Sequence, residues 1–265
     1  YLKIAEGCNK HCTYCIIPKV RGDFRSVPME NLVQEATDLA EKGVKELILV
    51  AQETTLYGMD LYGKKSLPEL LRKLAQVSGI FWIRILYCYP EEITDELIQT
   101  IKEEPKVCKY LDIPIQHASD AVLKRMGRRT NQKQLREMIE KLRREIPEIC
   151  LRTTLITGFP GETEEDHEEL MQFVDEMEFD RLGVFTYSQE EDTPAAIMPD
   201  QIPEEVKQER LDRLMLLQQK IAFEQNRLRI GSVEQVLVTD VDRDGACLGR
   251  SSREAPEIDG EIMIQ

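Results

Sequence analysis

The feature that most constrains the fold of this chain is a regular alternation of short apolar runs with longer segments of helical period. Six runs have the length and composition of buried strands, and each begins 28 to 44 residues after the one before. The runs are Leu2–Ala5, Glu46–Val50, Trp82–Leu86, Tyr110–Ile115, Cys150–Ile156 and Leu182–Phe185. Helices are predicted between them at Met29–Lys42, Leu67–Val77, Thr94–Lys102, Asn131–Glu145 and Glu164–Met177, with Asn131 and Thr163 as N-caps. Because parallel strands need helical crossovers, this alternation predicts an α/β fold with a parallel sheet.

Six such units predict a partial, six-unit parallel β/α barrel rather than a closed barrel of eight. An open doubly wound sheet is the alternative, since it is built from the same units. In both architectures the functional site lies at the carboxyl ends of the strands.

The repeat stops near residue 200, where the composition changes. Pro194, Pro199 and Pro203 interrupt the chain, and Glu204–Leu228 then has the period of a long amphipathic helix. Short strands and turns follow, at Val233–Thr239, Asp242–Gly245, Ala246–Gly249 and Glu261–Ile264. We therefore expect three parts: a barrel at 1–200, a linker and long helix at 201–230, and an apparently incomplete all-β module at 231–265.

Composition excludes several classes of protein. The chain is 42% hydrophobic and has no apolar run of the roughly 18–20 residues that span a bilayer, so neither a disordered nor an integral membrane protein is expected. A net charge of −14 argues against a protein that binds nucleic acid non-specifically, because such binding depends on Lys and Arg that neutralise many phosphates. Three of the seven cysteines fall within eight residues, which is unlike a secreted disulfide framework and favours the reduced cytoplasm. The chain begins at Tyr1 with no signal peptide and reads as if entered in mid-fold, so we expect a preceding segment.

The strongest chemical signal is the three-cysteine segment that directly follows the first predicted strand. Residues 8–15 read CNKHCTYC, so Cys8, Cys12 and Cys15 are separated by three and then two residues. Three thiolates on one short loop can ligate three irons of a 4Fe–4S cluster and leave the fourth iron open to a small molecule. A structural zinc site is the alternative, with His11 as the fourth ligand. The spacing differs from the paired two-residue spacings of zinc ribbons.

This motif, with Tyr14 before the last cysteine, resembles that of the radical S-adenosylmethionine (SAM) enzymes. Further segments resemble the methylthiotransferase branch of that family, and the last ones resemble a TRAM domain. They read EGCN at 6–9, CIIP at 15–18, RG at 21–22, RS at 25–26, GFPGETEED at 158–166, GRS at 249–251 and APEIDG at 255–260. The likeness covers nearly the whole chain, so we identify it as similar to this branch.

Within the branch, residues after the second predicted strand distinguish two substrates. Residues 52–60 read QETTLYGMD, which resembles the RimO type that thiomethylates an aspartate of a small-subunit ribosomal protein, number twelve. The alternative is the tRNA methylthiotransferase, which acts on isopentenyladenosine and tends to carry a GQNVN-like stretch there. Residues 87–90, 111–117 and 187–191 favour the RimO type as well.

Charge favours a protein substrate independently of the resemblance. Residues 229–265 hold four Arg, no Lys and eight carboxylates, which gives this module a net charge of −4. A module that holds tRNA should be basic, whereas an acidic one complements a basic protein. An acidic face that only contacts solvent is the plain alternative.

The resemblance implies a mechanism and its cofactors. Cys8, Cys12 and Cys15 would hold one 4Fe–4S cluster, whose open iron chelates SAM. Reductive cleavage of SAM then yields a radical that abstracts hydrogen from the β-carbon of the substrate aspartate, and a methylthio group couples there. An electron-donor protein is required. In the family the sulfur arrives through a second cluster in an N-terminal domain, which is not present in these residues, so the chain is expected to be a SAM-binding core that is incomplete for turnover.

The predicted cofactor contacts follow from the resemblance and from position. They are Tyr14, Gln52, Glu53, Arg152, Gly158 and Tyr187, and no catalytic side chain is expected beyond the cluster and SAM. Tyr14 and Arg152 have ordinary packing and ion pairing as alternatives. His117 is expected either in the lumen or as a core histidine, and His167 as a solvated residue on a charged helix.

From a different class, a zinc-loop binding module or a polar SAM-dependent methyltransferase would also account for parts of the sequence. Iron and sulfide in equal amounts would exclude the first, and a requirement for anaerobic conditions would exclude the second.

Overall fold

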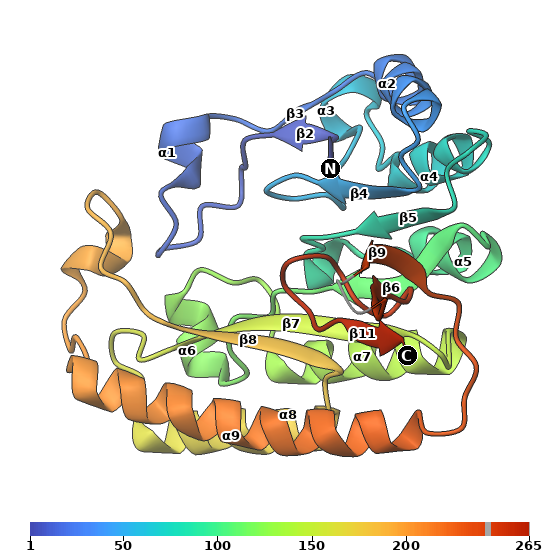
Figure 1. The fold of residues 1–265 in the computed structure, drawn as a ribbon. Coiled ribbons are helices and arrows are strands. Elements are labelled where there is room, and N and C mark those ends of the chain that lie inside the picture. Colours follow the sequence, from blue (N-terminus) through green and yellow to red (C-terminus); the bar gives the residue numbers. More distant parts are fainter. Residues whose placement is uncertain (242–244, 265) are drawn as a thin grey trace.

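The computed structural model describes residues 1–241 and 245–264. Its centre is a six-stranded sheet in the order β1-β4-β5-β6-β7-β8, in which every neighbouring pair is parallel. The strands are β1 (Leu2–Lys3), β4 (Glu46–Val50), β5 (Trp82–Ile85), β6 (Val107–Asp112), β7 (Cys150–Thr157) and β8 (Arg181–Thr186). The order follows the sequence, as helical crossovers of one hand require. The predicted six-unit parallel barrel is therefore confirmed, and Figure 1 shows the strands curving from β4 to β8 with helices on their outer side.

The helices lie where the period predicts them, and three short ones were not predicted. The long ones are α2 (Met29–Glu41), α4 (Leu67–Ala75), α5 (Asp95–Glu103), α7 (Gln132–Glu145), α8 (Glu164–Met177) and α9 (Glu204–Leu228). The short ones are α1 (Ile17–Arg21), α3 (Met59–Tyr62) and α6 (Asp120–Arg125), with 3₁₀ turns η1 (Pro90–Glu92) and η2 (Pro194–Ile197). Asn131 and Thr163 both form capping boxes. Each side chain accepts a hydrogen bond from the backbone amide three residues later, and the side chain of that later residue, Gln134 or Asp166, accepts one from the backbone amide of the cap.

The first predicted strand is divided in two. Leu2–Lys3 pairs with β4, whereas Ala5–Glu6 forms β2 and pairs antiparallel with β3 (Arg25–Ser26). Ile4 bridges the two, since its amide donates to Val50 O at 3.0 Å and its carbonyl accepts from Val27 N at 2.8 Å. The chain thereby leaves the sheet just before the cysteine segment.

The C-terminal module is a three-stranded antiparallel sheet of β9 (Leu237–Val241), β10 (Cys247–Arg250) and β11 (Ile262–Ile264). It follows α9, as predicted, although the first strand begins four residues later than expected. Of the predicted turn at Asp242–Gly245, residues 242–244 lie outside the described part of the chain.

The module packs against the amino-terminal halves of the barrel strands. Arg84 of β5, which is fully buried, donates to Glu46 Oε1 and to Ser252 O, both at 2.8 Å. Arg250 of the module reaches the other oxygen of Glu46 at 2.8 Å, and Tyr110 donates to Asp259 at 2.7 Å. Burying these charges is tolerable only because each has a partner.

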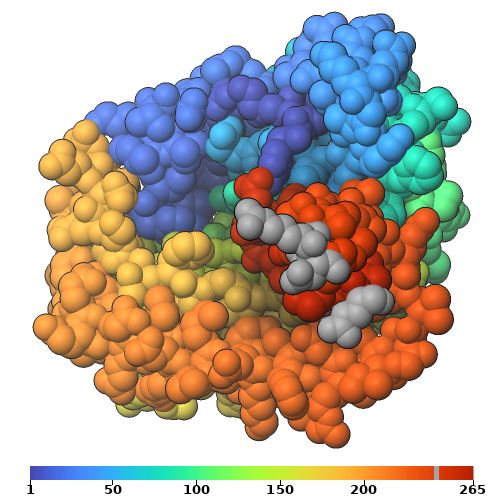
Figure 2. Space-filling view, in the orientation of Figure 1, coloured from blue at the N-terminus to red at the C-terminus, as the bar shows by residue number. Residues whose placement is uncertain are grey.

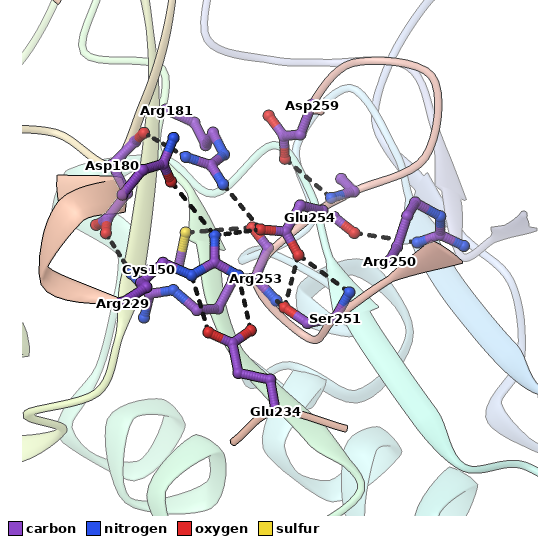
Figure 3. Close-up of polar contacts among 12 residues, drawn as sticks. Cys150, Asp180, Arg181, Arg229, Glu234, Arg250, Ser251, Arg253, Glu254 and Asp259 are labelled. Carbon is purple, nitrogen blue, oxygen red and sulfur yellow. Dashed lines mark hydrogen bonds and ion pairs between the residues drawn. The ribbon is translucent and has the colours of Figure 1, made fainter. Parts of the chain in front are cut away.

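A second group of contacts extends this interface toward α9. Figure 3 shows Glu254 accepting from Arg181 and Arg229, which come from β8 and from the segment after α9. Arg253 reaches Asp180 at 2.5 Å. The module is thus tied to two separate parts of the barrel. Figure 2 shows it filling the centre of this face, with a hollow between the blue N-terminal segment and the yellow segment near β8.

Candidate metal centre

The three cysteines lie on the loop that leaves β2 and enters α1, and the chain holds this loop at both ends. Gly7 has a φ of +81°, and a Cβ there would lie 2.2 Å from Asp23 O, so only glycine fits. Cys8 N donates to Gly22 O at 3.2 Å, and Asn9 Oδ1 accepts from Phe24 N at 3.1 Å. The return of the chain after α1 therefore fixes the first cysteine.

The middle of the loop is fixed by segments far away in sequence. The Thr13 amide donates to Met126 O at 3.0 Å, and its hydroxyl donates to Arg125 O at 2.8 Å, at the end of α6. Lys10 is buried and pairs with Glu91 at 3.4 Å and with Glu92. The loop is therefore held in place before any cofactor binds.

All three cysteines are free thiols close to one another. Cys8 and Cys12 are buried and Cys15 is partly exposed. Burial raises the pKa of Cys8, and the neighbouring Cys12, Glu53 and Cys15 raise it further because they would place negative charge beside a thiolate. Burial likewise raises the pKa of Cys15. Thiols with a raised pKa, such as those of Cys8 and Cys15, are stabilised as thiolates when they ligate a cation, so this donor set suits a metal cluster.

A cavity of about 400 Å³ opens beside the loop, at the carboxyl ends of the strands. It is lined by Cys8, Cys15 and Ile17 of the loop, by Lys3, Val50, Ala51 and Gln52 at the ends of β1 and β4, and by Tyr87 and Tyr89 after β5. This volume lies in the range of small-molecule sites, roughly 300–1,000 Å³. A larger groove, about 790 Å³, lies over α8 and is lined mainly by carboxylates such as Glu164 and Glu168. It is far from the cysteines in the fold and lacks their chemistry.

The donor set of the loop suits a 4Fe–4S cluster. Cysteines of such a cluster bind separate irons, so they need only line one side of a common space. Cys8, Cys12 and Cys15 are free thiols on one short loop, and Cys8 and Cys15 line the same cavity.

Of the six predicted cofactor contacts, Gln52 is the one that lines this cavity. Its Oε1 also accepts from Gly7 N at 2.8 Å, which links the end of β4 to the start of the cysteine loop. Glu53 is fully buried beneath the loop, where it accepts from Thr55 N at 2.9 Å and lies 4.0 Å from Lys10 Nζ. Burial raises the pKa of Glu53 to about 7, although Thr55 and Lys10 act against it.

The other four contacts do not line this cavity: Tyr14 lies on the cysteine loop beside Cys12, and Arg152, Gly158 and Tyr187 lie elsewhere in the barrel. Tyr14 and Tyr187 both pack edge-on against Phe159, with ring centroids 6.4 and 5.3 Å away. Gly158 has a φ of +72°, and a Cβ there would lie 2.2 Å from Lys207 Cγ of α9. Arg152 donates to Asp112 at 2.8 Å and lies 3.8 Å from Asp259, so carboxylates of β6 and of the C-terminal module engage its guanidinium. These contacts do not show whether any of the four residues binds a cofactor, so their role in cofactor binding stays a prediction.

Two residues beside Cys12 were not predicted from the sequence. The Tyr89 hydroxyl lies 3.3 Å from Cys12 Sγ, and the guanidinium carbon of Arg128 lies 4.3 Å from the centre of the Tyr89 ring. The only sequence signal for them is their position along the chain, because Tyr89 follows the end of β5 and Arg128 follows the end of α6, and both elements end near the cysteines.

The two buried histidines form a separate polar network. His117 Nδ1 accepts from Ser119 N at 3.0 Å, and its Nε2 lies 3.8 Å from Glu162, which also pairs with Arg210 at 3.1 Å. Burial lowers the pKa of His117 to about 4. The prediction that His167 is solvated is wrong, because the first turn of α8 directs it at Glu162, beneath α9. Cys88, Cys108 and Cys150 are buried in apolar clusters.

Comparison with known proteins agrees with this site. The radical SAM superfamily matches residues 2–174, and a TRAM domain matches residues 230–265. The chain therefore belongs to the radical SAM superfamily.

Two relatives make the likeness more specific. Both are named ribosomal protein uS12 methylthiotransferase RimO. The one from Lachnoclostridium phytofermentans is 66% identical, over all of this chain and 60% of its own length. The one from Pelobacter propionicus is 58% identical, over all of this chain and 59% of its own length. The chain thus spans about 60% of the length of these relatives. The resemblance to the RimO type is confirmed.

A solved structure shares the fold. The radical SAM methyltransferase TsrM from Kitasatospora setae, with cobalamin and a [4Fe–4S] cluster bound, matches with a TM-score of 0.58 and 17% identity, over 74% of this chain and 38% of its own. Among the described residues, no helix is long and apolar enough to cross a membrane.

Proposed function

We propose that this chain is the core of a radical SAM methylthiotransferase that adds a methylthio group to the β-carbon of an aspartate in small-subunit ribosomal protein number twelve. The observation that carries the proposal is the cluster-type cysteine loop beside a cavity of about 400 Å³, in a chain 66% identical to a relative of that name. We propose three parts in the chain, with the barrel at 1–200, the linker and helix at 201–230 and the module at 231–265.

In this proposal, Cys8, Cys12 and Cys15 hold one 4Fe–4S cluster, and SAM occupies the neighbouring cavity. When bound, the reduced cluster and SAM supply a radical able to remove hydrogen from an unactivated carbon. The chain's own residues position these groups: Gln52 faces the cavity and also holds Gly7 in place. The remaining predicted SAM contacts, Tyr14, Glu53, Arg152, Gly158 and Tyr187, stay predictions.

The first experiment tests the cofactors. The protein is reconstituted anaerobically with iron and sulfide, reduced in the presence of SAM, and assayed for 5′-deoxyadenosine. We expect about four irons per chain and product from the wild type, and no product from Cys12→Ala. Zinc in the loop, or an intact cluster that leaves SAM uncleaved, would contradict the proposal.

A basic protein is the substrate class that the surface charge of the module supports. Arg250 and Arg253 pair with Glu46 and Asp180 of the barrel, Arg229 pairs with Glu234 and Glu254 of the module, and the fourth arginine lies outside the described residues. The carboxylates of Asp240, Glu257 and Glu261 are exposed. An acidic surface attracts a basic protein and repels the phosphates of tRNA.

Binding measurements separate the two substrates. We expect the purified ribosomal protein to bind more tightly than tRNA, and the joint change Asp240→Asn, Glu257→Gln and Glu261→Gln to weaken that binding. A control set of exposed carboxylates on α2, Glu30→Gln, Glu35→Gln and Glu41→Gln, removes the same charge elsewhere and should have a smaller effect. Tighter binding of tRNA would favour the tRNA methylthiotransferase instead.

Further parts of the assignment remain proposals. An electron-donor protein reduces the cluster, a second cluster lies outside these 265 residues, and the reaction takes place in the cytoplasm.

A further inference from the structure

Tyr89 is placed where its hydroxyl can act on one cysteine of the proposed cluster. It follows β5 and directly precedes η1, and its hydroxyl lies 3.3 Å from Cys12 Sγ. Its ring also lines the cavity that Cys8 and Cys15 share. Cys12 itself is 5% exposed, so the hydroxyl competes with little water for this sulfur.

Two buried cations lie against the Tyr89 ring. Arg128 is 7% exposed, and its guanidinium carbon is 4.3 Å from the ring centre. Lys10 is 8% exposed, and its Nζ is 4.9 Å from the same centre. Both distances lie within the range of about 6 Å over which a cation is attracted to an aromatic face.

These cations are fixed differently. Lys10 is neutralised by carboxylates, with Glu91 at 3.4 Å, Glu92 closer and Glu53 at 4.0 Å. Arg128 donates one bond, from Nη2 to Pro114 O at 2.9 Å. Its Nε and Nη1 are buried and have no hydrogen-bond partner among the described residues. A buried guanidinium with two unused donors is costly, so its retention beside the site needs a compensating interaction there.

The direction of the Tyr89 hydrogen bond follows from the state of Cys12. In the free protein either group can be the donor. A cysteine that ligates iron is a thiolate without a proton, so the tyrosine hydroxyl then donates. Cations against the ring withdraw electron density from the phenol and make its O–H a stronger donor.

We propose that Tyr89 is a positioning residue that donates a hydrogen bond to the cluster-ligating sulfur of Cys12 and, together with the charge of Arg128, raises the reduction potential of the cluster. The inference rests on the proposed function, because it requires a cluster on this loop. A hydrogen bond to a ligating sulfur and a nearby positive charge both stabilise the reduced, more negative cluster. The group would thereby make the cluster easier to reduce for SAM cleavage.

The experiment compares the midpoint potential of the reconstituted cluster in four variants, by redox titration followed with electron paramagnetic resonance. Tyr89→Phe removes the hydroxyl and keeps the ring, and Arg128→Gln removes one charge and keeps the hydroxyl. Both should shift the potential to more negative values at unchanged iron and sulfide content. The controls are Tyr87→Phe, which removes a hydroxyl from the same cavity, and Arg129→Gln, which removes a charge from an exposed neighbour. Neither control should shift it.

A further replacement distinguishes hydrogen bonding from packing. A 3-fluorotyrosine at position 89 is a stronger donor of nearly the same shape, so it should shift the potential in the opposite direction to Tyr89→Phe. Equal potentials for the wild type and Tyr89→Phe, each with a full cluster, would overturn the inference and leave the proposed function intact. A wild-type protein that assembles no cluster would overturn the proposed function, and this inference with it.

Discussion

The buried histidine network makes the stability of this protein depend on pH in a defined window. Burial lowers the pKa of His117 from its ordinary value of 6.5 to about 4, because the ring lies in a fully buried site. Between these two values the unfolded chain binds a proton at this residue and the folded chain does not. The free energy of unfolding must therefore fall as the pH is lowered through this window. The loss attributable to His117 is about 2–3 kcal/mol between pH 7.5 and 4.5.

The measurement is urea unfolding followed by the fluorescence of Trp82, the single tryptophan. His117→Asn keeps an acceptor for the Ser119 amide and removes the titrating ring. The charged groups around His117, which include Glu162, Asp166, His167 and Arg210, are present in both proteins, so the comparison isolates the ring of His117. We expect the wild type to lose about 2–3 kcal/mol more than the variant over this range.

The exposed His11→Asn supplies the control, since it removes a histidine without touching the network, and its pH profile should follow that of the wild type. Identical pH profiles for the wild type and His117→Asn would refute the reasoning. That result would mean that the folded protein takes up the proton as readily as the unfolded chain does.

Three further predictions concern the interface, a helix start and the cysteine loop. Arg84→Met should lower the free energy of unfolding by about 1.5–3 kcal/mol, because it removes one of the two arginine partners of the buried Glu46 and the donor to Ser252 O; the exposed Arg72→Met should cost less than about 1 kcal/mol, and equal losses in urea unfolding would contradict this. Thr163→Ala should cost about 1 kcal/mol through loss of the capping box, and Thr163→Ser should restore most of it in the same assay. Gly7→Ala should reduce the iron bound on reconstitution, because the added Cβ collides with backbone, whereas Gly43→Ala, with a similar positive φ and open space around it, should bind iron normally.

The fold was predictable because its local signals agree with the tertiary arrangement. Glu46–Val50 and Glu164–Met177 were predicted to the residue, since a buried run in one case and the Thr163 cap in the other define the ends. The strand predicted at Tyr110–Ile115 lies at Val107–Asp112 instead. The apolar pattern continues through Pro114 into a buried loop, and burial alone does not distinguish a strand from such a loop.

The site was predictable where its residues are close in sequence or follow the end of a predicted strand. The spacing of the three cysteines predicts a cluster loop, and Gln52 at a strand end is in the cavity. Tyr89 and Arg128 come from segments more than 70 residues away, and their role depends on which side chains burial brings against Cys12. His167 shows the opposite failure. Its charged helix predicts a solvent-exposed side chain, whereas the side chain is buried because α9 covers it.

One end of the barrel strands binds the C-terminal module, and the other end borders the cavity beside the cysteines. This division explains why the arginines that contact the module are gathered at one end. At the amino-terminal ends, Arg84, Arg250 and Glu46 hold the module in place. At the carboxyl ends, Gln52 and Tyr89 border the cavity beside the cysteines. Arg250 and Arg253 of the module pair with Glu46 and Asp180, whereas the carboxylates of Asp240, Glu257 and Glu261 are exposed, so the described solvent-facing side of the module is acidic. A partner that contacts both the acidic side of the module and the cavity must therefore reach from one end of the barrel strands to the other. Substitutions of the exposed carboxylates on the module should leave the assembly of a cluster on the cysteine loop unaffected.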